Sequence, residues 1–188
     1  SEGSCRRKSA GSCRCLTRRG DTMAWQDVVF QYDGSFDGFL CCVFESYVHK
    51  EFPIAFYSDE ECFSLYSVRS ILTVPEHARR VYRGIFKRSK RAAELLHRAF
   101  LTCMEDKELH LYTFVRKLMD EGPDFLRNQS DAAYYPVAKA LRHMSGELEK
   151  LRGFIRFSEY SGVLGAEIEP KNRVLPLLRN HFCDRYAN

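Results

Sequence analysis

FIRFSEYSGVLGAEIE, which spans residues 154–169, decides how the last third of this chain folds. Its two outer segments are short and rich in β-forming residues. Ser161-Gly162 between them suits a two-residue turn, because glycine tolerates the positive φ that such turns require. We therefore predict a hairpin in which Tyr160 pairs with Val163. This register places Arg156 opposite Glu167 as a cross-strand pair of opposite charges, on the face away from the apolar side chains.

An amphipathic helix is predicted after this hairpin, with Asn172 as its N-cap. His181 and Arg185 lie four residues apart, on or beside the apolar side of that helix. Polar groups that face a core need partners, and Glu167 or Glu169 can supply them. One interpretation is a catalytic site in which His181 is the acid or base, Glu167 orients it and Arg185 holds an anion. The other interpretation is a structural cluster of ion pairs.

The N-terminal part predicts a strand that leads into a buried helix. Val28–Tyr32 is rich in β-formers, and the turn that follows contains Asp33 and Ser35. Either of these two residues can cap a helix that begins near Phe36. The amides of the turn could instead bind a phosphate at the helix N-terminus. Capping is favoured, because Asp33 and Asp37 add negative charge there.

The middle of the chain is predicted to be mainly helical. The pattern between residues 49 and 61 indicates a loop, the second half of 63–74 is β-prone, and Thr73 can cap the first of several helices. These helices are expected near 76–88, 90–104, 106–121 and 131–152. The predicted fold class is α+β, with a small antiparallel or mixed sheet built from the N-terminal strands and the C-terminal hairpin, and a mainly helical insertion between them.

One stretch of the predicted helices is strongly basic. Seven cations occur within thirteen positions, without an acid among them: Arg79, Arg80, Arg83, Lys87, Arg88, Lys90 and Arg91. Such a patch can bind nucleic-acid phosphates with an affinity that depends on salt. The alternative is a solvated helix face that pairs with acids such as Glu105, Asp106 and Glu108.

Two separated motifs resemble those of a known family. The C-terminal motif comprises residues 154–157, 166–170, 172–176 and 181–185, and the N-terminal one is Tyr32-Asp-Gly-Ser-Phe-Asp-Gly-Phe-Leu40. Both are similar to a bacterial family of DNA metabolism or repair proteins whose mechanism is unknown, and the resemblance spans about residues 28–188. It implies DNA as a partner, together with a radical-SAM protein beside which family members occur. A similar domain precedes some UdgX-type uracil-DNA glycosylase domains, so a glycosylase-like partner is also implied. Because the family pattern continues into another strand, the resemblance further implies a truncated C-terminus.

Composition and charge set further limits. Residues 1–22 carry the whole net charge of +4 and almost no large apolar side chain, so we expect a disordered basic leader outside the native domain. Residues 23–188 are expected to form one α+β domain. The five cysteines of residues 23–188 are not spaced as in a disulfide-bonded protein, which favours reduced thiols and a cytoplasmic protein. No apolar run has the length of a membrane span, and no spacing of histidines or cysteines predicts a metal site or a cofactor.

Three functions remain open from the sequence. The first is a DNA-binding or accessory factor of DNA repair or metabolism, which engages DNA, a radical-SAM partner enzyme, or both. The second is an enzyme that acts on nucleic acid through Glu167, His181 and Arg185. The third is an adaptor that binds only protein.

Overall fold

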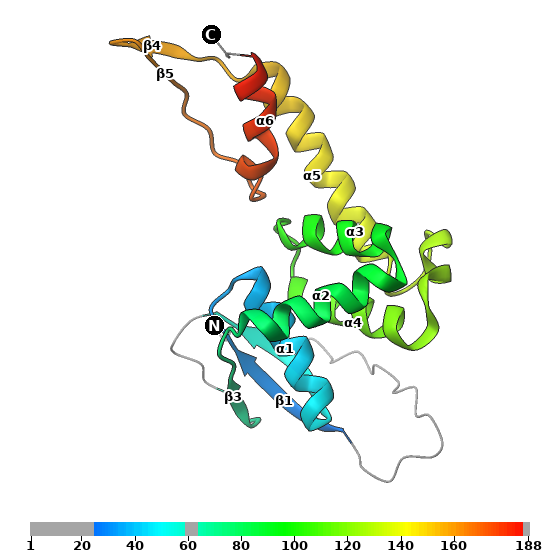
Figure 1. The fold of residues 1–188 in the computed structure, drawn as a ribbon. Helices are drawn as coiled ribbons and strands as arrows, with labels where there is room; N and C mark the ends of the chain where they lie inside the picture. The colour runs from blue at the N-terminus through cyan, green and yellow to red at the C-terminus, as the bar shows by residue number, and fades with distance from the viewer. Residues whose placement is uncertain (1–24, 59–63, 186–188) are drawn as a thin grey trace, which may run out of the picture.

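The computed structural model describes residues 25–58 and 64–185, so the leader predicted at 1–22 lies outside the described residues. Figure 1 shows a small sheet with one helix at the N-terminal end, a group of helices beside it, and a long helix that leads away to a second, two-stranded sheet. The α+β fold class is confirmed. The N-terminal strands and the C-terminal hairpin form two separate sheets.

Three parallel strands make up the first sheet. β1 (Gln26–Gln31) is central, with β2 (Glu51–Tyr57) on one side and β3 (Val68–Ser70) on the other. The prediction of a loop over this part of 49–61 is wrong, because residues 51–57 form β2. Pro53 concealed the strand, since proline is rare within sheets. It is tolerated here because β2 is an edge strand, and the ladder to β1 shifts register just after Pro53.

Helix α1 (Phe36–His49) begins as predicted. The side chain of Ser35 is its N-cap and accepts a hydrogen bond from the amide of Gly38 at 2.9 Å. Cys41 and Ser46 of this helix are both 0% exposed. The reason is that α1 is covered on more than one side: Cys41 Sγ contacts the backbone of Val74, and Ser46 Oγ lies 2.9 Å from the hydroxyl of Tyr112.

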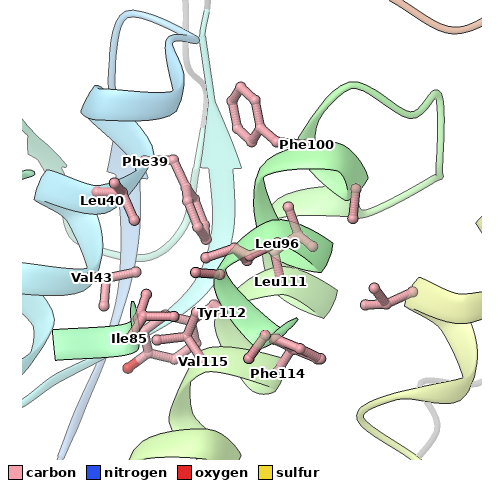
Figure 2. Close-up of a cluster of buried hydrophobic side chains, with 14 of the residues drawn as sticks. Phe39, Leu40, Val43, Ile85, Leu96, Phe100, Leu111, Tyr112, Phe114 and Val115 are labelled. Carbon is pink, nitrogen blue, oxygen red and sulfur yellow. The ribbon is translucent and has the colours of Figure 1, made fainter. Parts of the chain in front are cut away.

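Four further helices confirm the predicted helical insertion. They are α2 (Pro75–Arg88), α3 (Lys90–Phe100), α4 (Lys107–Glu121) and α5 (Tyr135–Phe154), with a short 3₁₀ helix at Pro123–Arg127. Figure 2 shows the core in which side chains from α1 to α4 meet. The prediction that Thr73 caps α2 is wrong. The N-cap position is Val74, and the hydroxyl of Thr73 donates to Asp33 instead, at 2.7 Å.

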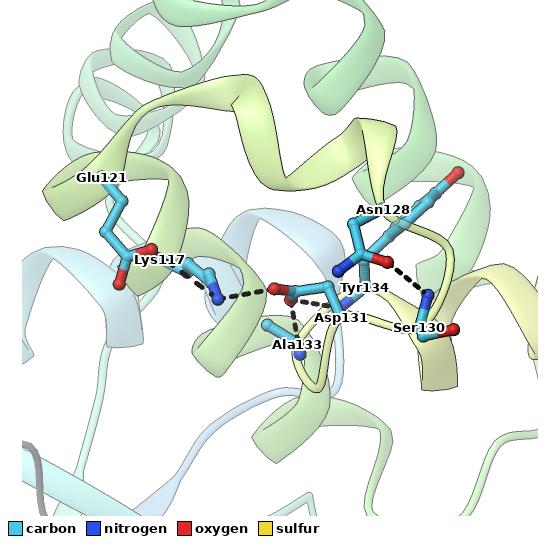
Figure 3. A network of polar contacts seen from close by, with 7 residues as sticks. All are labelled: Lys117, Glu121, Asn128, Ser130, Asp131, Ala133 and Tyr134. Atoms are coloured by element: carbon cyan, nitrogen blue, oxygen red, sulfur yellow. Dashed lines mark hydrogen bonds and ion pairs between the residues drawn. The ribbon is translucent and has the colours of Figure 1, made fainter.

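Asp131 fixes the junction between α4 and α5 (Figure 3). One carboxylate oxygen binds Lys117 Nζ at 2.7 Å, and the other accepts from the amides of Ala133 and Tyr134. Burial favours the neutral acid, but these contacts outweigh it and hold the pKa of Asp131 below its ordinary value. All three contacts lie within this junction, so the cluster is structural.

The C-terminal hairpin is shorter than predicted. β4 (Ser158–Tyr160) and β5 (Val163–Gly165) are antiparallel, and Tyr160 pairs with Val163 as expected. The turn residues have positive φ, 51° and 79°, as a type I′ turn requires. The predicted pair of Arg156 with Glu167 is wrong, because the ladder ends at Ser158 and Gly165. Helix α5 continues to Phe154, and residues 155–157, which were predicted to belong to the first strand, connect α5 to β4 instead.

Helix α6 (Leu175–Arg185) packs beside α5 (Figure 1). Asn172 is not its N-cap, which corrects the prediction. It is 3% exposed, its Oδ1 accepts from the amide of Cys103 at 2.9 Å, and its Nδ2 donates to Glu147 at 2.6 Å. Asn172 therefore does not cap α6 but connects the C-terminal segment to α5 through Glu147 and to the loop after α3 through Cys103. Within residues 25–58 and 64–185, no helix has both the length and the apolar character needed to cross a membrane.

Candidate nucleic-acid interface

The basic patch lies on α2 and the start of α3. Helix α2 buries Ala78, Val81 and Ile85 against the core, at spacings of three and four residues. Because the period of an α-helix is 3.6 residues, most of the positions between them lie on the side of the helix that faces solvent. The sequence therefore places its cations on the outer face of α2, and all seven predicted patch residues are exposed.

Three members of the patch have contacts within the chain. Arg88 Nη1 donates to the carbonyl oxygen of Met119 at 2.7 Å, which satisfies a group in the last turn of α4. The guanidinium of Arg80 lies 5.7 Å from the ring centre of Phe44. Lys90 approaches Glu94 at 3.9 Å, and both side chains are exposed, so this pair contributes little.

The other four members are Arg79, Arg83, Lys87 and Arg91. Across the part of the chain that the structure describes, none of these four side chains forms an ion pair or a hydrogen bond. Acids at 105, 106 and 108 were the predicted alternative partners of the patch. Of these, Glu108 accepts from the hydroxyl of Tyr32 at 2.9 Å and lies 3.6 Å from Lys107.

Arg79, Arg83 and Lys87 form a stripe along α2, with a rise of about 6 Å between neighbours because they are four residues apart. The stripe lines a shallow pocket of about 390 Å³. The other residues that line it are Glu76, Arg80 and Gly84. The pocket therefore contains four cations and one carboxylate, and any small anion or phosphate that enters it meets a strongly positive surface.

A second pocket, of about 320 Å³, opens beside the stripe between α1, α2 and α3. Arg79 and Arg83 line both pockets. The remaining lining of the second pocket is largely aromatic and apolar, and consists of Phe36, Asp37, Leu40, Ala78, Tyr82 and His97. None of these residues was predicted to line a site, although the interleaving of Tyr82 and Phe86 with the cations of α2 is a signal that could have indicated an aromatic surface beside the patch.

The motif residues Asp33 and Ser35 are engaged with their own chain. Asp33 Oδ1 accepts from the amide and the hydroxyl of Ser35, at 2.9 and 2.7 Å, and Oδ2 accepts from Thr73. Burial opposes ionisation, yet these three donors hold the pKa of Asp33 below its ordinary value. This arrangement builds the turn before α1, in agreement with the capping interpretation.

The predicted catalytic residues lie in the C-terminal part, away from the basic stripe in sequence. Glu167 is exposed after the end of β5, and Arg185 is exposed at the last residue of α6. His181 is partly buried, and its Nε2 is buried without a hydrogen-bond partner. Among the described residues, Glu167 and His181 form no ion pair with each other, and neither pocket described above is lined by any of the three. Arg156 is exposed between α5 and β4. A catalytic role for these side chains stays a prediction.

Residues 25–58 and 64–185 contain no group of three or more His, Cys, Asp or Glu side chains that could hold a metal ion. The cysteines at 41 and 42 are buried and free, and those at 103 and 183 are exposed and free.

Comparison with known proteins adds one finding. Residues 105–188 match the model of a family described as a domain of unknown function, DUF4130. No curated protein and no solved structure matches the chain significantly. The matched region includes α4, α5, the hairpin and α6, and therefore the predicted catalytic residues. The basic stripe of α2 and both pockets lie outside it.

Proposed function

We propose that the protein binds the phosphate backbone of DNA through the exposed stripe Arg79, Arg83 and Lys87 of α2, as a factor in DNA metabolism. The observation that carries the proposal is that these three cations are exposed and aligned and lack acidic partners within residues 25–58 and 64–185. The DNA-metabolism setting, and action with a radical-SAM or uracil-DNA glycosylase-like partner, are proposed from the family resemblance of the two sequence motifs.

Like charges four residues apart destabilise a helix. The pairs Arg79–Arg83 and Arg83–Lys87 each cost about 0.2–0.5 kcal/mol in an isolated helix. This cost is small, and within residues 25–58 and 64–185 no acidic side chain forms an ion pair with any of the three cations; the one carboxylate that lines the stripe's pocket is that of Glu76. A polyanion that lies along the stripe would neutralise these like charges, because each cation would be attracted to a phosphate, and the polyanion would release its counterions.

Fluorescence anisotropy with a labelled DNA duplex, measured over a series of salt concentrations, tests the proposal. The logarithm of the association constant falls linearly with the logarithm of the salt concentration, with a slope of about −0.9 per neutralised phosphate for duplex DNA. If the three cations each neutralise one phosphate, they alone predict a loss of affinity of about 40-fold between about 50 and 200 mM salt. Replacing all three by alanine should reduce the magnitude of the slope by about 2 to 3.

The control is a second triple variant with the same residue types, Arg142→Ala, Lys150→Ala and Arg179→Ala. These side chains are also exposed, but they lie on α5 and α6. The two triple variants have the same net charge, so an effect of overall charge would appear in both. Arg80 and Arg88 stay unchanged, because their contacts with Phe44 and Met119 belong to the fold. Equal slopes in the wild type and both variants, or no binding by the wild type at low salt, would refute the proposal.

A further inference from the structure

The pocket between α1, α2 and α3 has the composition of a site for a flat, polar ligand. Leu40 and Ala78 are buried and supply an apolar floor, while Phe36 and Tyr82 are partly buried and His97 is exposed. Its volume of about 320 Å³ lies at the lower end of the range of about 300–1,000 Å³ that is typical of small-molecule sites.

The rings in this pocket are arranged so that one can stack with a ligand. Phe36 packs edge-on against both neighbours: its centroid is 6.3 Å from that of Tyr82, with 81° between the planes, and 5.1 Å from that of His97, with 86°. The Tyr82 ring is tilted by 33° relative to Phe86, which is exposed one turn further along α2. This arrangement leaves Tyr82 at the boundary between the pocket and solvent, within an aromatic surface that continues along the helix.

The rim of the pocket has groups of both signs. Arg79 and Arg83 belong equally to the phosphate stripe, so a ligand in the pocket is directly next to that stripe. Asp37 is exposed and, in the described part of the chain, has no ion-pair or hydrogen-bond partner. A free carboxylate in an aromatic pocket can accept hydrogen bonds from N–H groups at the edge of a ring.

We propose that this pocket receives one unstacked nucleobase of single-stranded DNA, whose neighbouring phosphates lie along Arg79, Arg83 and Lys87. This inference rests on the proposed function and specifies its substrate: a base reaches the pocket only when it is unpaired, so single strands bind more tightly than duplex. Asp37 accepts from the exocyclic amino group of the base. Cytosine, which has such a group, therefore binds better than thymine, which has a carbonyl at that position.

The first test compares a single strand with a duplex of the same sequence. Replacing Tyr82 by leucine keeps apolar bulk but removes the ring. It should weaken binding to the single strand by about 5- to 150-fold, which corresponds to the loss of one base stacked on one aromatic side chain. Binding to duplex should stay unchanged, because only phosphates are engaged there. Tyr82→Phe, which retains the ring, should restore single-strand affinity. Tyr135→Leu, at an exposed tyrosine of α5, is the matched control.

The second test compares oligo(dC) with oligo(dT), two pyrimidine strands of equal charge. The wild type should bind oligo(dC) severalfold more tightly. Asp37→Asn should reduce the ratio of the two affinities toward one, even though removing a negative charge beside the stripe raises both affinities. The ratio separates base recognition from this electrostatic gain.

The outcomes distinguish this inference from the proposed function. If single strand and duplex bind equally and Tyr82→Leu changes neither, while the triple variant of the stripe weakens both, the base pocket is refuted and the phosphate interface remains. If the wild type binds no DNA, both are refuted. If Tyr82→Leu lowers the melting temperature, His97→Ala, on the exposed side of α3, is used for the comparison of single strand with duplex. An unchanged preference of His97→Ala for the single strand would also refute the pocket.

Discussion

Glu147 is predicted to hold the C-terminal segment onto α5. Its Oε1 accepts from the amide of Lys171 at 2.7 Å, and its Oε2 accepts from the amide and the side chain of Asn172 at 3.1 and 2.6 Å. The partly buried carboxylate of Glu147 thus binds three donors, two of which belong to a residue that is almost completely buried. We expect Glu147→Ala to destabilise the protein by leaving those donors without an acceptor.

The size of the effect follows from these contacts. A hydrogen bond to a charged acceptor contributes about 1.5–3 kcal/mol, and the three bonds share one carboxylate that is partly accessible to water, so we do not add them. Unsatisfied donors on buried Asn172 cost about 1–3 kcal/mol. We therefore expect a loss of about 2–4 kcal/mol in the free energy of unfolding, or a fall of about 4–16 °C in Tm.

The assay is chemical denaturation followed by circular dichroism, with hydrogen exchange at Lys171 and Asn172 to localise the change. Glu149→Ala is the control on the same helix, because Glu149 is exposed and its one ion pair among the described residues is with nearby Arg152. This control should change stability by less than about 0.5 kcal/mol. Equal denaturation midpoints for Glu147→Ala and Glu149→Ala would show that the three hydrogen bonds do not stabilise the docking of the segment.

The same contacts predict a pH dependence. Burial raises the pKa of Glu147, but the hydrogen bonds from Asn172 and Lys171 lower it more, so the pKa in the folded protein is below its ordinary value of 4.5. A carboxyl whose pKa falls on folding stabilises the protein above its unfolded pKa, and this contribution is lost as the pH falls through the folded pKa. The stability difference between the wild type and Glu147→Ala should therefore be full at pH 7 and decrease below about pH 4.5.

Two other predictions concern the N-terminal part of the fold. A Cβ at Gly38 would collide with the carboxylate of Asp33, which is itself held by hydrogen bonds. Gly38→Ala should therefore lower the free energy of unfolding by about 1–3 kcal/mol in denaturation experiments. At Gly146 a Cβ meets nothing within 4 Å, so the control Gly146→Ala should raise the free energy of unfolding by about 0.5–1 kcal/mol. Burial raises the pKa of the Cys42 thiol, so alkylation located by mass spectrometry should modify exposed Cys103 quickly and Cys42 only on unfolding; equal rates in the native protein would contradict this.

Local features were predictable from the sequence because they depend on residues close together in the chain. Ser161-Gly162 supplied the positive φ of the hairpin turn, and with it the pairing of Tyr160 with Val163. Ser35 was one of the two residues expected to cap α1, and the apolar spacing of the middle region predicted its helices. The basic run from Arg79 to Arg91 was recognisable from composition alone.

The candidate site depended on contacts that no local pattern encodes. Asp37 and His97 are sixty positions apart in the sequence, and they share a pocket only because α1 and α3 both pack against α2. The same holds for Asn172, whose polar side chain suggested a helix cap but is buried between Glu147 and Cys103. Strand β2 was not predicted, because Pro53 is unfavourable in most strands. Its composition does not show that β2 lies at the edge of the sheet, where a proline can be accommodated.

The sequence by itself determined where the chain turns, where its helices run and which helix carries unbalanced positive charge, since backbone preferences and periodicity act over a few residues. Only the tertiary structure decided which cations lack partners and which aromatic rings lie beside them. Charge pairing and pocket shape depend on distances between elements, and these are set when the helices pack.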